Sequence, residues 1–203
     1  MTKITFDEET HTFSTDYDFS GKNTIEFVDG RENITIGQGT LPANKDIRNF
    51  KASGKFHTKN DITCQNVDVS GMWRLGNVRC TNFRGTGKGR ADSVSCKDFY
   101  MCGKMNCMSV VADKVVMSQR PGGEIGSMTA KSVEIGANYK DVKAKHPILA
   151  WIAEKITDNK TLYIHNLTCD TAVIDGDVTI GALKCKGKCT VLGDKVKILK
   201  EEK

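Results

Sequence analysis

The chain lacks the features by which an exported or membrane-spanning protein is usually recognised. Its first ten residues, MTKITFDEET, have neither a basic start nor an apolar stretch, so no signal peptide is predicted. The longest apolar run, residues 148–153, is far too short to span a bilayer. We therefore expect a soluble chain in the cytoplasm.

The chain also has no large excess of positive over negative charge, and it has few aromatic side chains. The 30 basic and 25 acidic residues give a formal net charge of +5 and are well mixed along the chain. Aromatic residues make up only 7% of the chain, and no basic segment carries the interleaved aromatics of a nucleic-acid platform. Nucleic acid is therefore not an expected partner, and the scattered lysines and arginines are expected to serve solubility.

Eight cysteines are present, but the spacings of a metal site are missing. There is no CxxC pair, and no histidine is close to Cys102 and Cys107. Residues stacked on neighbouring strands would have Cβ atoms about 4.8 Å apart, whereas a disulfide needs roughly 3.5–4.5 Å. We expect no metal, and free thiols that act as small apolar side chains, which suits a reducing cytosol.

Recognisable catalytic motifs are missing as well. None of the four histidines lies beside a serine or cysteine in a nucleophile motif, and His165 is expected to face outward. The glycine-rich segment 85–90 lacks the spacing of a phosphate-binding loop. We expect no enzyme activity and no cofactor. An enzyme like the left-handed hexapeptide acyltransferases stays open as an alternative, because isolated Ile-Gly pairs occur at Ile36, Ile135 and Ile180.

What the sequence does contain is a sixteen-residue repeat. Each repeat opens with an aliphatic residue, has a small residue two places on, and has a bulkier apolar residue three places later. Four repeats begin at Ile62, Val78, Val94 and Val110. Glycines punctuate them at Gly54, Gly71, Gly87 and Gly103. A repeat of this kind is a unit that stacks on its neighbours, so it sets the architecture.

Within each repeat the apolar residues alternate, which is the pattern of a β-strand. A step of three residues between successive pairs breaks the alternation, as a corner would. We therefore predict an all-β fold: a single-stranded parallel β-helix, or β-solenoid, with about sixteen residues per coil. Six inward columns follow, and they begin at Ile62, Cys64, Val67, Val69, Trp73 and Leu75.

A single coil of this kind cannot be stable alone. It buries about six side chains, each contributing roughly 1.5–3 kcal/mol. Ordering sixteen residues costs on the order of 16–30 kcal/mol of backbone entropy. Coils must therefore stack, and the two ends of the stack expose unpaired strand edges that can join other copies.

The repeat also divides the chain. Residues 1–46 are less regular and are expected to form an N-terminal coil or cap, with a hairpin turn at Asp29 and Gly30. The solenoid is expected over 47–137, with a first coil seventeen residues before the next and a two-residue slip near Pro121. It resumes over 161–193, with a changed corner or a terminal coil expected after Cys185. A charged tail follows at 194–203 and is expected either to add a strand or to cover that end of the solenoid.

Residues 138–160 interrupt the repeat and have helical character. Ile148, Ile152 and Ile156 recur at four residues, and Pro147 suits a first helical turn, so one short inserted helix is predicted. Trp151, Ile148 and Ile152 are the candidate contacts to a protein partner or to a membrane surface. Membrane association therefore stays open.

The repeat unit, as in VRCTNFRGTG (78–87) and MTAKSVEIG (128–136), resembles that of the bactofilins, the polymer-forming cytoskeletal proteins of bacteria. The resemblance covers about residues 47–193 and is greatest to the cytosolic type of Gram-positive bacteria. It implies a right-handed β-helix without a cofactor, which assembles end to end without nucleotide. The chain departs from the family in its cysteine-rich column and in having no short apolar N-terminal tail.

We therefore predict a non-enzymatic bacterial cytoskeletal or scaffold protein that self-assembles through the ends of its solenoid. The C-terminal assembly surface is predicted to contain Val178, Ile180, Leu183 and Val191. The expected partner is the chain itself, and a cell-envelope protein is left open as a second one. The alternative to assembly is a binding module that recruits a protein or a membrane surface through its inserted helix.

Overall fold

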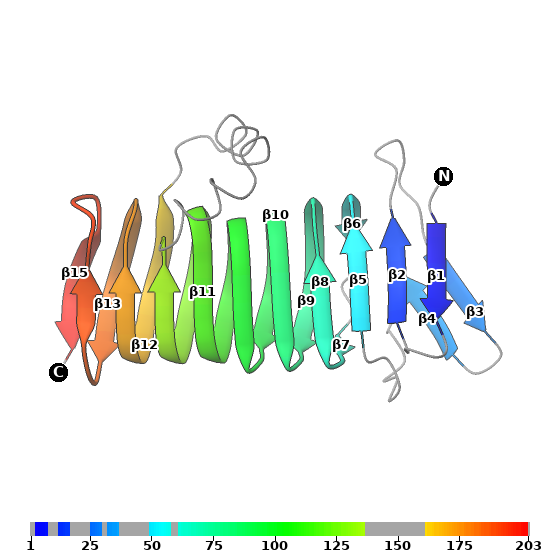
Figure 1. Cartoon of the computed structure of the whole chain (residues 1–203), viewed down its shortest axis with the longest axis horizontal. Coiled ribbons are helices and arrows are strands. Elements are labelled where there is room, and N and C mark those ends of the chain that lie inside the picture. The colour runs from blue at the N-terminus through cyan, green and yellow to red at the C-terminus, as the bar shows by residue number, and fades with distance from the viewer. Residues whose placement is uncertain are drawn as a thin grey trace.

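Most of the described chain winds into one stack of parallel strands, and the two termini lie at opposite ends (Figure 1). The computed structural model describes residues 3–7, 12–16, 25–29, 32–36, 49–57, 61–136 and 161–202. In this part of the chain the fold is all-β, a parallel solenoid of about 7 turns, which confirms the predicted fold class. The predicted inserted helix lies outside the described residues.

Strands occupy almost the whole solenoid. They are β5 (Asn49–Ser53), β6 (Lys55–His57), β7 (Ile62–Thr63), β8 (Asn66–Val69), β9 (Met72–Arg79), β10 (Asn82–Ser95), β11 (Asp98–Ile135), β12 (Leu162–Ile174), β13 (Val178–Cys185), β14 (Cys189–Val191) and β15 (Lys197–Glu202). In the middle of the stack the strands continue around the corners without a break, so β11 covers more than two coils.

The register confirms the predicted columns. Phe83 pairs with Val67 in the coil before it and with Phe99 in the coil after it, which gives a step of sixteen residues. The earliest coil has a step of seventeen, since Phe50 pairs with Val67. We name the three sides of the solenoid by the inward columns that they carry. Face A carries the columns that contain Trp73 and Leu75, face B those that contain Ile62 and Cys64, and face C those that contain Val67 and Val69.

Glycine is required at the corner between faces C and A. Gly71, Gly87 and Gly103 have φ angles of 88°, 89° and 110°, in the left-handed region that side chains disfavour. A Cβ atom at any of the three would overlap the carbonyl oxygen of the glycine one coil earlier. Two independent constraints therefore require glycine at this corner: the positive φ angle, and the lack of space for a Cβ atom against the preceding coil.

Large and small core residues compensate for one another between coils. A Cβ atom at Gly89 would overlap the indole ring of Trp73, so the glycine makes room for that ring. The Trp73 Nε1 donates a hydrogen bond to the carbonyl oxygen of Thr86 (3.1 Å), which satisfies its one polar group. Phe83 and Phe99 stack with ring centroids 5.2 Å apart. The interior is thereby filled although the column of Trp73 narrows to a glycine.

Two irregularities fall at the same corner, between faces C and A. The first is the two-residue slip near Pro121, which lengthens the step from one coil to the next to eighteen residues. This step is seen where the backbone N–H of Glu124 donates a hydrogen bond to Asn106 Oδ1 in the coil before it. The longer insertion follows one coil later, and the solenoid then resumes on face A, where Leu162 pairs with Gly123. The sequence predicted that the repeat resumes at Leu162, and the structure shows which columns it rejoins.

The C-terminal part contains the predicted change of corner. Cys189 pairs with Ala172, a step of seventeen, so the corner after Cys185 has gained one residue. The charged tail then forms β15, which pairs in parallel with β13 through Ile198 and Ile180. The tail thus becomes one more rung of the solenoid.

The N-terminal strands are arranged differently from the coils. β1 (Lys3–Asp7) and β2 (Thr12–Asp16) form an antiparallel pair, and β2 pairs in parallel with β5 on face C. β3 (Ile25–Asp29) and β4 (Glu32–Ile36) form a separate antiparallel pair in which Asp29 lies opposite Glu32, and this confirms the predicted hairpin. The sheet of the solenoid therefore ends in the antiparallel strand β1.

Candidate functional site: the ends of the solenoid

The C-terminal end presents strand edges that pair with nothing in the described part of the chain. β15 pairs only with β13, and β14 pairs only with β12. The outer side of each strand therefore carries backbone N–H and C=O groups that another strand could engage.

Apolar side chains surround these edges. Val191, Leu192 and Leu199 are 45%, 61% and 65% exposed, values that are high for large aliphatic residues. Val196 and Ile198 are partly buried against the core. We call these five residues the end cluster: Val191, Leu192, Val196, Ile198 and Leu199. It is the layer that another solenoid would cover.

The structure places the predicted C-terminal assembly residues differently from the prediction. Val178, Ile180 and Leu183 are buried in the chain's own core, because β15 lies over β13 as a further rung. Val191 is exposed at the C-terminal end. The exposed C-terminal surface is therefore formed by β14 and β15, and not by β13. The predicted partner contacts Trp151, Ile148 and Ile152 lie outside the described residues.

Both edge strands have the same order of charge along the chain. β1 begins at Lys3 and ends at Asp7, and β15 begins at Lys197 and ends at Glu201 and Glu202. Antiparallel pairing of either strand with itself or with the other places a lysine opposite a carboxylate, which is favourable. Parallel pairing would place like charges opposite one another. The edges are therefore complementary in one orientation only.

Glu201 makes the C-terminal edge selective. It pairs with Leu183 and so continues a column that is apolar in every earlier coil. A charge at an inward position is a known means of preventing indiscriminate pairing of strand edges. Lys200 Nζ lies 2.7 Å from Glu202 Oε1 and lowers the pKa of that carboxyl group. A strand that paired with this edge would therefore have to match the charges as well as cover the end cluster.

Cys64, Cys80 and Cys96 form one column on face B and are partly buried against the core. All eight cysteines are free thiols, and the Cys64 thiol donates to the carbonyl oxygen of Asn66 (3.3 Å). Burial raises the pKa of Cys64 to about 12. A hydrogen bond to the Cys96 thiol, together with burial, raises the pKa of Cys80. The thiols of Cys64 and Cys80 therefore stay protonated near neutral pH and are poor nucleophiles and ligands.

No group of three or more His, Cys, Asp or Glu residues that could hold a metal ion occurs in the described part of the chain. Alternating charges instead line the corner between faces B and C, at Lys97, Asp113, Lys131, Asp170 and Lys186. Lys131 Nζ lies 2.9 Å from Asp113 Oδ1, and Lys186 Nζ lies 3.2 Å from Asp170 Oδ1. The hydrogen bond to Asp113 raises the pKa of Lys131. Because all four side chains are largely exposed, these pairs contribute little to stability but favour the native register.

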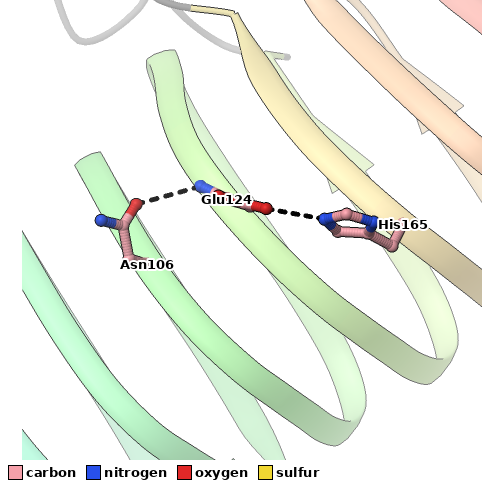
Figure 2. A network of polar contacts seen from close by, with 3 residues as sticks. All are labelled: Asn106, Glu124 and His165. Carbon is pink, nitrogen blue, oxygen red and sulfur yellow. Dashed lines mark hydrogen bonds and ion pairs between the residues drawn. The ribbon is translucent and has the colours of Figure 1, made fainter.

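A polar network on face A joins the coils on either side of the insertion (Figure 2). The Asn106 Oδ1 accepts a hydrogen bond from the backbone N–H of Glu124 (3.1 Å). Glu124 Oε1 lies 2.7 Å from His165 Nε2, and the His165 ring meets the edge of Tyr163 at 4.6 Å between centroids. His165 faces outward, as predicted. The network is open to solvent and links β11 to β12, so a structural role accounts for it.

Comparisons of the chain with protein-family models, curated proteins and solved structures give no match. Over the residues that the structure describes, no helix is both long enough and apolar enough to cross a membrane.

Proposed function

We propose that the protein is a non-enzymatic structural protein that self-assembles end to end through the strand edges of its solenoid. One observation supports this most: within the described part of the chain, one side of each of β1, β14 and β15 pairs with no other strand. The charges of the edge strands β1 and β15 also complement each other in antiparallel pairing. A cytoskeletal or scaffold role in the cytoplasm follows from the resemblance to the bactofilins.

The energetics of a junction favour assembly that depends on concentration. Complete burial of the five residues of the end cluster would contribute at most about 8–15 kcal/mol. The loss of translational and rotational freedom on association costs an estimated 4–15 kcal/mol. Interchain backbone hydrogen bonds add roughly 0.5–1.5 kcal/mol each. Because gain and cost are of similar size, we expect short assemblies at low concentration and longer ones at high concentration.

The test is sedimentation velocity with negative-stain electron microscopy of the purified chain over a range of concentrations. Elongated assemblies should grow with concentration. The variant V191K/L199K places two charges in the end cluster at positions that are already exposed, so it should fold normally and shift the distribution toward single chains. The matched control is V111K, since Val111 is 47% exposed on face B, away from both ends. It should assemble like the unaltered chain.

Two results would contradict the proposal. One is an unaltered chain that stays monomeric across salt and protein concentration. The other is V111K losing assembly to the same extent as V191K/L199K, which would point to lateral contacts and not to contacts between ends.

A further inference from the structure

The outer side of face A carries an array of cations over three successive coils. In β9 the burial pattern alternates, with Trp73 and Leu75 inside and Met72 and Arg74 outside. The same alternation in β10 places Lys88 and Arg90 outside, on either side of the buried Gly89. In β11, Lys104 precedes the buried Met105 and therefore also points outward.

The parallel register brings these residues together. Arg90 pairs with Arg74, and Lys88 pairs with Lys104. Paired residues on adjacent strands are separated by about 4.8 Å, and residues two apart on one strand by about 6.6 Å. We call Arg74, Lys88, Arg90 and Lys104 the basic array. Its four cations lie on three adjacent strands of one flat side of the solenoid.

The basic array is not neutralised within the described part of the chain. Over these three coils the outward positions of face A contain one acid, Asp92. None of the four cations takes part in an ion pair found among the described residues, whereas Lys131, Lys186 and Lys200 each have a carboxylate partner. Like charges that face each other across a strand pair destabilise a sheet. An external anion would remove this repulsion.

Exposed methionines flank the cations. Met72 pairs with Lys88 and is 43% exposed, and Met108, at the corner between faces A and B, is 67% exposed. Large apolar side chains beside lysine and arginine are typical of surfaces that lie on a membrane interface, where cations meet headgroups and apolar groups enter the acyl boundary. On face A, the outward positions of these three coils carry no aromatic ring on which a nucleic-acid base could stack.

We propose that the outer side of face A binds the surface of an anionic lipid bilayer, with the basic array on the headgroups and Met72 and Met108 at the interface. This function is separate from end-to-end assembly, because face A runs along the side of the stack (Figure 1). The basic array of a single chain has four cations, and we expect it to bind weakly. An assembly presents many arrays on one rigid body and binds far more tightly through multivalency.

The test is co-sedimentation of the full chain with vesicles that contain phosphatidylserine, compared with vesicles of phosphatidylcholine alone. Binding should require the anionic lipid and should fall as salt is raised. R74Q/R90Q should reduce the partition coefficient of the single chain about 30-fold, at about fivefold for each residue. The matched control K97Q/K114Q removes the same charge from exposed lysines away from face A, and it should change binding by less than about threefold.

M72S/M108S keeps the net charge and should also weaken binding, which separates interfacial contact from bulk electrostatics. Equal binding to both kinds of vesicle, or equal loss in R74Q/R90Q and K97Q/K114Q, would overturn the proposal. Binding of duplex DNA that is as tight as binding of vesicles, and equally sensitive to R74Q/R90Q, would overturn it in favour of a nucleic-acid surface. Sedimentation velocity without vesicles reports assembly separately, so failure of one proposal is not mistaken for failure of the other.

Discussion

The stacking of coils at the glycine corner can be tested by two substitutions that differ in one respect only. Gly87 and Gly176 have nearly identical φ angles, 89° and 88°. A Cβ atom at Gly87 would overlap the carbonyl oxygen of Gly71, whereas a Cβ atom at Gly176 meets nothing within 4 Å. Comparing Gly87→Ala with Gly176→Ala therefore isolates the contact between coils from the cost of the backbone conformation.

The expected magnitudes follow from these two terms. An alanine in the left-handed region costs roughly 1–2 kcal/mol, and both variants bear this cost. Relief of the overlap at Gly87 requires a shift of packed backbone, which costs about 1–3 kcal/mol more. The reduced freedom of the unfolded chain returns about 0.4–1 kcal/mol in both variants. We expect Gly176→Ala to lose about 1 kcal/mol of unfolding free energy and Gly87→Ala about 2–4 kcal/mol.

The assay is urea unfolding followed by far-UV circular dichroism, at a protein concentration low enough to keep the chains single. The slope with denaturant should stay the same in both variants, so that the shift in midpoint measures stability. Equal midpoints for the two variants would refute the reasoning, because the carbonyl of Gly71 would then not lie against Gly87. The sixteen-residue stacking on which the fold depends would be wrong at that corner.

Three further predictions concern the core, the charged corner and the thiols. Gly89→Ala should cost about 1–3 kcal/mol through overlap with the Trp73 ring, and in a Trp73→Leu background most of this cost should disappear, as a double-mutant cycle of urea midpoints will show. Asp113→Lys places a third cation between two lysines of the corner, so it should lower the melting temperature at low salt and much less at high salt. Because the pKa of Cys64 is about 12 in the folded chain against an ordinary value of 9.0, the unfolded chain loses this proton first as pH rises. Stability should therefore fall between pH 9 and 12, and Cys64→Ala should remove part of that fall in unfolding midpoints measured against pH.

The columns were predictable because strand alternation and coil length are local properties of the sequence. Trp73 above Gly89, and Phe83 above Phe99, follow from counting sixteen residues. The phase after the insertion did not follow, since Leu162 could have restarted any face. Only the hydrogen-bonded register with Gly123 decides it.

The C-terminal surface was misplaced for a related reason. The sequence of β15 is short and charged, and Glu201 interrupts an apolar column, so the tail only weakly indicates another rung. Its pairing with β13 buries Val178, Ile180 and Leu183 and moves the open edge outward by one rung. The edge of the solenoid is the last strand that pairs with it. Whether β15 pairs with β13 depends on backbone hydrogen bonds, which the alternation of side chains does not by itself reveal.

The basic array was missed although a signal for it was present. Arg74 and Arg90, like Lys88 and Lys104, are sixteen residues apart at outward positions. Along the chain these cations are dispersed among acids, so the linear sequence predicts a role in solubility and not a basic surface. Counted by column they fall on one face, and the fold places Arg90 beside Arg74 and Lys88 beside Lys104 on adjacent strands.

The sequence by itself determined the coil, its length, the inward columns and the glycine corner, because these depend on side-chain alternation and on dihedral angles that each residue carries with it. The tertiary structure alone decided which strands are the edges, which face the chain rejoins after its insertion, and which charges become neighbours. Those properties depend on pairing between residues distant in sequence, and an array of four cations exists only once the coils that carry them are stacked.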